Sequence, residues 1–266
     1  GNSLIISPWN YPVQLLLNPL VGAISAGCTA FLKPSPYVPN VSEVLEKMIS
    51  ETFDPNYISI ARGNREINSH LLGQRWDLTF FTGSPDLGKT VMNAAARHLT
   101  PVVLELGGKS PCIIDKSADI KVAAKRIAWG KTLNAGQTCI APDYLLIHPK
   151  IKGEFIEEFK RNVKVLHGDD IKESSHYVRI VSDKAFLRVT QYLNDGKILY
   201  GGRFDPNEKF IEPTLLEIEN VECNVMKEEI FGPVFPLITL SSDNFTQEAL
   251  SFINNREKPL ALYYFG

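Results

Sequence analysis

Cysteine and histidine are scarce in this sequence. Its 266 residues include four cysteines, at positions 28, 112, 139 and 223, and five histidines. No two cysteines form a C-x-x-C pair, and no histidine falls near a cysteine at zinc-ligand spacing. A disulfide framework and a zinc site are therefore excluded as organising features, and we expect no metal. A reducing compartment, the cytoplasm, is the expected location.

The sequence also lacks an excess of charge of either sign and any long apolar run. The 28 basic and 30 acidic residues leave a net charge of −2, which gives no electrostatic reason to bind nucleic acid or anionic lipid. The most apolar run, residues 20–32, is interrupted by Gly, Ser and Thr and is too short to cross a bilayer. We expect neither nucleic acid nor a membrane as partner of this segment. A hydrophobic content of 44% is typical of globular proteins.

Hydrophobic periodicity predicts alternating strands and helices in the first part of the chain. Strand-like segments lie at residues 2–7, 29–34, 57–63, 77–84 and 101–108. Helix-like segments lie between them, at residues 12–27, 40–53, 65–74 and 85–98. This alternation predicts an α/β fold with a doubly wound parallel sheet.

The pattern restarts after Gly108, so we expect a domain boundary at residues 106–108. Further strands are predicted at residues 110–115, 144–149, 197–202, 213–219, 234–240 and 260–265, and helices at 120–133, 151–166 and 183–193. The sequence begins and ends within apolar, strand-like segments. We therefore expect it to be an internal piece of a longer protein.

Functional groups in open α/β sheets lie at the carboxyl ends of the strands. In this sequence those ends carry Asn10, Lys33, Gly83 with Ser84, and Glu105. Gly83 and Ser84 precede a helix and could bind a pyrophosphate at its N-terminus, or form an ordinary turn. Glu105 follows three apolar residues. Burial would desolvate its carboxylate and suit it to be a general base, whereas a strand-end glutamate facing water is the alternative.

Cys139 lies in the stretch NAGQTCIAPDY, residues 134–144, between small residues and a proline. We interpret Ala135 and Gly136 as leaving space beside the sulfur. No histidine is near, which argues against a thiol protease, and a buried structural cysteine remains an alternative.

Six motifs give the sequence a resemblance to a known family. SPWNYP, LKPS, FTGS, LELGGKSP, GQTCIAPDY and EEIFGPV occur in the order found in the NAD(P)-dependent aldehyde dehydrogenase superfamily. The sequence around LELGGKSPCIID and GQTCIAPDY is most similar to that of the class 3 branch, which acts on fatty and aromatic aldehydes. The resemblance covers essentially the whole sequence.

The resemblance implies a role for each site residue. Cys139 is implied as the nucleophile, Asn10 as an oxyanion ligand and Glu105 as the base that activates water. Cofactor positions are implied for Trp9, Lys33, Gly83, Ser84, Glu229 and Phe231, with NAD or NADP as cofactor. Residues 1–106 would form an NAD(P)-binding domain, incomplete at its N-terminus, and residues 107–266 a catalytic domain, incomplete at its C-terminus. The full-length protein would be a homodimer.

One position departs from the family. Relatives commonly have K-P-S-E where this chain has Lys33-Pro34-Ser35-Pro36. Two alternatives to aldehyde oxidation remain: a CoA-acylating enzyme, in which a thiol resolves the thioester, and a non-catalytic protein of the same fold. Glu105 argues against the first, and Cys139, Asn10 and Glu105 together argue against the second.

Overall fold

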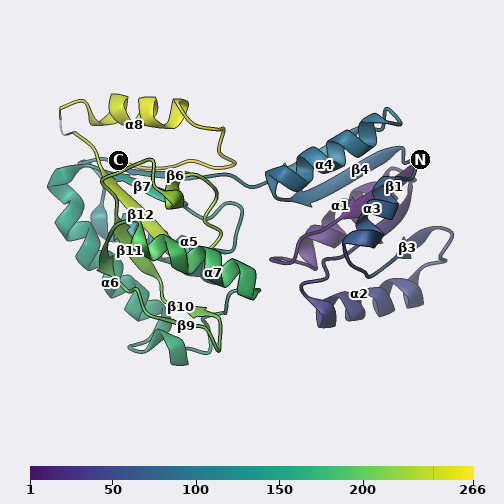
Figure 1. Ribbon diagram of the computed structural model, residues 1–266, viewed down its shortest axis with the longest axis horizontal. Coiled ribbons are helices and arrows are strands. Elements are labelled where there is room, and N and C mark those ends of the chain that lie inside the picture. Colours follow the sequence, from purple (N-terminus) through teal and green to yellow (C-terminus); the bar gives the residue numbers. More distant parts are fainter. Residues whose placement is uncertain (242) are drawn as a thin grey trace. The chain divides into compact units, whose positions relative to one another are not determined.

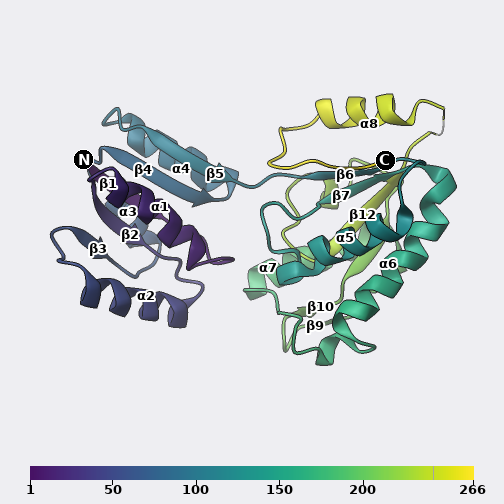
Figure 2. The same ribbon diagram turned by 180° about the vertical axis from the view of Figure 1, so that it is seen from behind.

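The computed structural model describes residues 1–241 and 243–266. The chain folds into two compact units, Gly1–Leu106 and Gly107–Gly266, which we call the N-terminal and the C-terminal unit. Figure 1 shows both units, and Figure 2 shows them from behind. Each unit has a sheet of its own.

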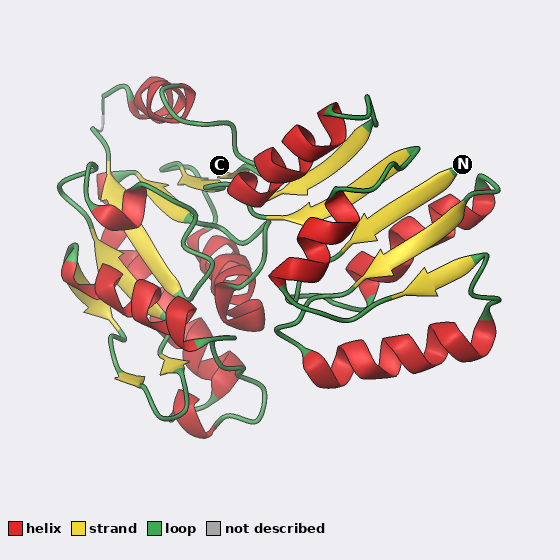
Figure 3. Cartoon of the chain, turned by 45° about the vertical axis from the view of Figure 1, so that its right-hand side comes forward, coloured by secondary structure: helices red, strands yellow, loops and turns green. Residues whose placement is uncertain are grey.

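The N-terminal unit is built on a five-stranded parallel sheet of order β3-β2-β1-β4-β5. Its strands are β1 (Asn2–Ile6), β2 (Thr29–Lys33), β3 (Ile58–Ile60), β4 (Leu78–Gly83) and β5 (Val102–Leu106), and its helices are α1 (Gln14–Ser25), α2 (Pro39–Thr52), α3 (Arg65–Leu72) and α4 (Pro85–Ala96). The arrows of these five strands all point the same way in Figure 3. The prediction of a parallel α/β sheet is confirmed.

Alternating side chains of β1 explain why helices cover both faces of this sheet. Ile5 packs into a cluster with residues of α1 and α2, including Leu16 and Leu45. Leu4, one residue earlier and on the other face, packs with Leu71 of α3 and Val91 of α4. Because successive strand residues point to opposite faces, an unbroken apolar strand needs a helical layer on each side.

The order of the strands reverses at β1. The chain runs outward from β1 to β2 and β3, and then returns to place β4 on the other side of β1. In sheets of this kind, ligands bind outside the carboxyl ends of the strands at the point of reversal. That point lies between β1 and β4 here.

The C-terminal unit has a six-stranded sheet of order β13-β6-β7-β12-β11-β8. All neighbouring strands are parallel except β8, which is antiparallel to β11. The strands are β6 (Pro111–Ile114), β7 (Tyr144–Ile147), β8 (Lys197–Tyr200), β11 (Thr214–Glu217), β12 (Val234–Thr239) and β13 (Tyr263–Phe265), and β9 (Phe204–Asp205) with β10 (Phe210–Ile211) forms a separate small ribbon.

Four helices accompany this second sheet: α5 (Ile120–Thr132), α6 (Lys152–His167), α7 (Asp183–Gln191) and α8 (Phe245–Asn254). The fully buried strands β6 and β7 form the centre of one large core with α5 and α6. Short 3-10 segments lie at Leu133–Gly136, Pro149–Ile151, Ile171–Glu173, Tyr192–Asn194 and Asn224–Met226. Helix α8 was not predicted from the sequence, and the strand predicted at residues 260–265 begins only at Tyr263.

Candidate functional site

The site residues predicted in the N-terminal unit lie at one edge of its sheet. In the parallel register Ile6 is opposite both Lys33 and Phe81, and Gly83 is opposite Leu106. The carboxyl ends of β1, β2, β4 and β5 therefore meet at this edge. Trp9 and Asn10 follow the end of β1, and both are half-buried.

Lys33 is a buried ammonium at the end of β2. Its side chain is almost fully enclosed, at 1% exposure, and Nζ donates to the carbonyl of Pro34 at 2.8 Å. Burial lowers the pKa of Lys33. A buried cation with one carbonyl partner retains two N–H donors for other acceptors.

Gly83 and Ser84 form the turn between β4 and α4. A Cβ atom at Gly83 would lie 2.5 Å from the ring of Phe81, so a larger residue would require this ring to move. Ser84 is the N-cap residue of α4, and its side chain makes no capping hydrogen bond. The positive end of the α4 dipole and an available hydroxyl thus occur together at the reversal point of the sheet.

Two buried hydroxyl groups at the same edge have no hydrogen-bond partner among the residues that the structure describes. They are Ser7 Oγ, directly after β1, and Thr82 Oγ1, near the end of β4. An unpaired buried hydroxyl costs stability and commonly marks a site that a ligand or water completes. Together with Lys33 and the N-terminus of α4, these hydroxyls suit the ribose and phosphate groups of a dinucleotide.

The sequence left open whether Glu105 is buried or faces water, and the structure decides between these alternatives. β5 is an edge strand, and its side chains alternate between half-buried and exposed, with Glu105 among the exposed ones. The apolar residues before Glu105 indicated burial on both faces, but a strand at the edge of a sheet is covered less completely. Glu105 therefore corresponds to the water-facing alternative.

Cys139 lies in the C-terminal unit, after an unusual backbone segment. Asn134, Ala135 and Gly136 all have left-handed backbone, with φ of 50°, 52° and 72°. A Cβ atom at Gly136 would overlap the carbonyl oxygen of Gly232, and Ala135 is fully buried. Gly136 is thus small because its backbone packs against the backbone of Gly232.

The side chain of Gln137 holds this segment in place. It is 2% exposed, and its Nε2 donates to the carbonyls of Asn134, at 3.0 Å, and of Arg179, at 3.2 Å. Its Oε1 accepts from the backbone N–H of Val181 at 3.0 Å. One amide group therefore fixes the residues before Cys139 to a distant part of the same unit.

Cys139 itself occupies a tight turn. The N–H of Ala141 donates to the carbonyl of Thr138 at 2.9 Å and closes the turn around Cys139 and Ile140. Cys139 is half-buried, whereas Cys112 on β6 is fully buried, and burial raises the pKa of the Cys112 thiol far above its usual value. Cys139 is thus the more accessible of these two thiols, which favours a reactive role over a structural one.

Residues of three sequence motifs meet beside this turn. Lys109 of LELGGKSP forms an ion pair with Asp143 of GQTCIAPDY and donates to the carbonyl of Glu228 at 2.9 Å. Asp143 accepts from the N–H of Ile230, in EEIFGPV, at 2.9 Å. Arg188 of α7 donates to the carbonyls of Glu229, at 3.0 Å, and Ile230, at 2.8 Å. The loop that carries Glu229 and the strained Phe231, with φ of 47°, is therefore held from two sides.

Glu229 lies against the glycine pair that begins the C-terminal unit. A Cβ atom at Gly107 would overlap its carboxylate, and the N–H of Gly108 donates to it. Burial raises the pKa of Glu229 to about 7, with a further increase from Asp143, while the Gly108 hydrogen bond, Lys109 and Arg188 oppose the rise. The carboxylate is thus close to half-ionised at neutral pH.

Lys131, near the end of α5, is a second buried charge in this region. It is 1% exposed, and its Nζ lies 5.4 Å from the ring centroid of Phe235. Burial lowers the pKa of Lys131 to about 8, although Asp143 and Glu229 favour its charged form. Sequence analysis missed Lys109, Lys131, Gln137, Asp143 and Arg188. The first four lie in or beside the quoted motifs, whereas no local signal marks Arg188.

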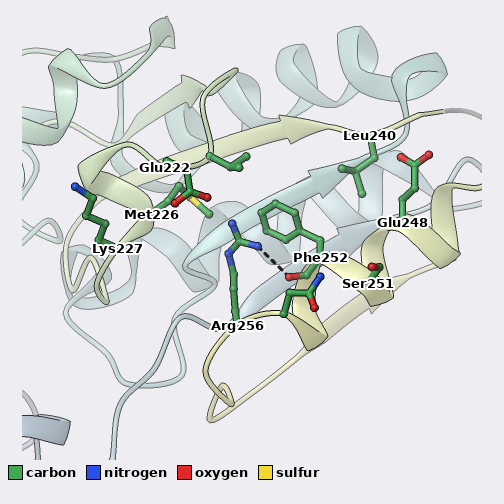
Figure 4. A pocket seen from close by; sticks show the side chains of 10 residues that line it. Glu222, Met226, Lys227, Leu240, Glu248, Ser251, Phe252 and Arg256 are labelled. Carbon is green, nitrogen blue, oxygen red and sulfur yellow. Dashed lines mark hydrogen bonds between the residues drawn. The ribbon is translucent and has the colours of Figure 1, made fainter.

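A pocket of about 670 Å³ lies elsewhere in the C-terminal unit, between α8 and the turn that follows β11 (Figure 4). Arg256 lies over the Phe252 ring, 3.5 Å from its centroid, and donates to the Phe252 carbonyl at 3.0 Å. Glu222, Lys227 and Glu248 also line the pocket. None of the predicted site residues lines this pocket, so the Cys139 turn remains the candidate site.

The family model for the aldehyde dehydrogenase family matches residues 1–266. The chain belongs to the aldehyde dehydrogenase family. It is 48% identical to 4,4'-diaponeurosporen-aldehyde dehydrogenase of Staphylococcus aureus and 46% identical to the dimeric NADP-preferring aldehyde dehydrogenase of Rattus norvegicus. Both alignments cover 100% of this chain and 58% of the relative. Family 3 members are also among its relatives, which agrees with the class 3 resemblance.

The structural comparison gives the same family. A substrate-bound structure of Staphylococcus aureus AldH has a TM-score of 0.96 and 47% identity, and it is matched over 100% of this chain and 58% of that chain. The chain thus spans a little over half the length of these aldehyde dehydrogenases. Among its described residues, no helix is long and apolar enough to span a membrane.

Proposed function

We propose that the protein containing this chain oxidises an aldehyde to a carboxylic acid with NAD+ or NADP+. The observation that carries the proposal is the half-buried Cys139 on a tight turn, with Gln137 fixed before it. Membership of the aldehyde dehydrogenase family supports a catalytic role for this thiol.

The N-terminal unit is proposed to bind the dinucleotide. Lys33 would contact a ribose, Gly83 and Ser84 the pyrophosphate, and Trp9 would form part of the adjoining wall. The unpaired hydroxyls at the reversal point of the sheet and the uncapped N-terminus of α4 support this assignment. In the C-terminal unit, Glu229 would accept hydrogen bonds from the nicotinamide ribose, and Phe231 would lie beside the nicotinamide ring. What a bound nicotinamide supplies is a hydride acceptor.

The carbon–sulfur chemistry is assigned to Cys139. Its thiolate would attack the aldehyde carbonyl and form a thiohemiacetal. The backbone N–H of Cys139 and the side-chain amide of Asn10 would stabilise the oxyanion. Oxidation of the thiohemiacetal leaves a thioester on the same sulfur. The tight turn supports this role because it holds the sulfur and the N–H of one residue in a fixed relation.

Glu105 is proposed to activate the water that hydrolyses the thioester. A carboxylate can remove a proton from water as the oxygen attacks the acyl carbon, and the acid and the thiol are then released. Membership of the aldehyde dehydrogenase family supports this step, whereas the exposure of Glu105 lends it no support.

Cofactor choice is proposed to depend on Pro36. Proline has neither the acceptor for a ribose 2′-hydroxyl nor the charge that would repel a 2′-phosphate, so NADP should be accepted as well as NAD. Two carboxylates of α2 are already paired, since Glu46 contacts Arg62 at 2.6 Å and Glu43 contacts it at 3.9 Å. Pairing with Arg62 reduces their ability to replace the missing glutamate. The rat relative is named NADP-preferring and dimeric, and we propose a cytoplasmic homodimer here also.

The test is an absorbance assay for reduced nicotinamide with the intact protein, a panel of aldehydes and both cofactors. The proposal predicts NAD(P)H formation without CoA, and loss of turnover but not of cofactor binding in Cys139→Ala. Turnover that requires CoA would indicate the acylating reaction instead. No turnover with any aldehyde, with or without CoA, would favour a non-catalytic protein.

A further inference from the structure

Two adjacent tyrosines occupy β13, the edge strand beside β6. Tyr263 is opposite Cys112 and Tyr264 is opposite Ile113 in the parallel register. Successive strand side chains point to opposite faces, so the two rings have different surroundings. Tyr263 is half-buried, whereas Tyr264 is 53% exposed and makes no hydrogen bond through its hydroxyl among the residues that the structure describes.

The hydroxyl of Tyr263 reaches the turn that carries Cys139. It donates to the carbonyl oxygen of Ile140, the residue directly after Cys139, across 123 positions of sequence. Burial raises the pKa of Tyr263, and the nearby Cys112 and Cys139 raise it further. The phenol therefore keeps its proton at neutral pH and remains a hydrogen-bond donor.

Tyr263 complements the anchor formed by Gln137. The amide of Gln137 fixes the backbone before Cys139, at Asn134, and the Tyr263 hydroxyl fixes the backbone after it, at Ile140. The backbone hydrogen bond from the Ala141 N–H to the Thr138 carbonyl closes the turn between these anchors. Loss of the Tyr263 hydroxyl would remove one of the contacts that hold the turn, and a shift of the turn would carry the Cys139 N–H and sulfur with it.

We propose that Tyr263 is a positioning residue, which holds the Cys139 turn in the orientation that aldehyde addition requires. This inference rests on the proposed function of Cys139 as the nucleophile. The addition step needs both the sulfur and the oxyanion donor in place, and a displacement of about 1 Å can lower a rate by roughly a hundredfold.

The test compares Tyr263→Phe with Tyr264→Phe in the intact protein. Each substitution removes one hydroxyl from the same strand and keeps the ring, so the second is a matched control for the first. Cofactor titration gives the number of folded sites, to which all rates are normalised. Three quantities are then measured: the cofactor Kd, kcat/KM for an aldehyde, and the rate of Cys139 alkylation by iodoacetamide, with the modified peptide identified by mass spectrometry.

Tyr263→Phe is expected to lower kcat/KM for the aldehyde by roughly ten- to a hundredfold. Its cofactor Kd should stay unchanged. The rate of Cys139 alkylation should change much less than aldehyde turnover, because the reaction of the thiolate with iodoacetamide expels iodide and forms no oxyanion. Tyr264→Phe should match the wild type in all three quantities.

Three results would overturn the inference: wild-type kcat/KM in Tyr263→Phe, an equal loss in Tyr264→Phe, or a parallel loss of cofactor affinity, which indicates a general structural role. The Cys139→Ala variant separates this failure from failure of the proposed function. If wild-type turnover survives Cys139→Ala, the nucleophile is assigned wrongly and the inference falls with it.

Discussion

Cofactor affinity should depend on pH through the carboxyl group of Glu229. This group lies beside Gly107 and Gly108, and burial raises its pKa to about 7 from a usual value of 4.5. Only the ionised form is a pure acceptor for two ribose hydroxyls. About one molecule in ten carries the charge at pH 6 and about nine in ten at pH 8, so NAD affinity should rise up to about ninefold across this range.

The same shift predicts how stability depends on pH. A carboxyl group whose pKa is raised by folding stabilises the protein below its unfolded pKa, and this contribution is lost as the pH rises through its folded pKa. Compared with Glu229→Gln, the wild type should therefore lose stability between about pH 4.5 and pH 7. A shift of about 2.5 pKa units corresponds to about 3 kcal/mol as an upper limit.

The assay is titration calorimetry with NAD at pH 6, 7 and 8. NAD is preferred to NADP because a 2′-phosphate titrates near pH 6 and would add its own dependence. Glu229→Gln should bind NAD more weakly at pH 8 and show no dependence on pH. The matched control is Glu228→Gln, since Glu228 is adjacent in the chain but is largely exposed, with its carboxylate at the hydroxyl of Tyr192. Wild-type affinity that is flat or falls with pH would refute the reasoning.

Three further predictions follow from individual residues. Glu105→Gln should give a burst of reduced cofactor followed by a slow steady state in rapid mixing, and an unchanged steady rate would remove Glu105 from the mechanism. Pro36→Glu should lower kcat/KM for NADP relative to NAD by several-fold to several-hundred-fold. The introduced carboxylate would repel the 2′-phosphate of NADP, and like charges about 4 Å apart repel by roughly 1 to 4 kcal/mol. A hundredfold wild-type preference for NAD that Pro36→Glu leaves unchanged would contradict this prediction. Gly136→Ala should unfold at a lower temperature by thermal melting, because its left-handed backbone and contact with Gly232 leave no room for a methyl group. Gly153→Ala lies in α6 and its added Cβ would meet nothing within 4 Å, so this control should melt at or above the wild-type temperature.

The architecture of the N-terminal unit could be predicted because its signals are local. Apolar strands, amphipathic helices and the turns between them follow one another in short segments, and each strand end carries its own polar residue. Once the strands are parallel, Lys33, Gly83 and the residues after β1 must share one edge. The burial of a given side chain is not local in this way. The apolar neighbours of Glu105 left open whether it is buried, and the position of β5 at the edge of the sheet leaves it exposed.

The arrangement around Cys139 could not be predicted because it depends on contacts distant in sequence. Lys109 and Asp143 meet across 34 positions, and Tyr263 reaches Ile140 across 123. The sequence shows Gly136 as small, but only the structure shows that it packs against Gly232. The motifs therefore led to the candidate site, while the reason for several of their residues is tertiary packing.

The identity of the nucleophile can be tested most directly by trapping the acyl-enzyme. Glu105→Gln protein is mixed with aldehyde and NAD, quenched in acid, digested and examined by peptide mass spectrometry. The account predicts the mass of the acyl group on the peptide that contains Cys139, at a yield matching the burst of reduced cofactor. Acyl mass on a peptide containing Cys28, Cys112 or Cys223 instead, or a burst without any acylated peptide, would contradict it.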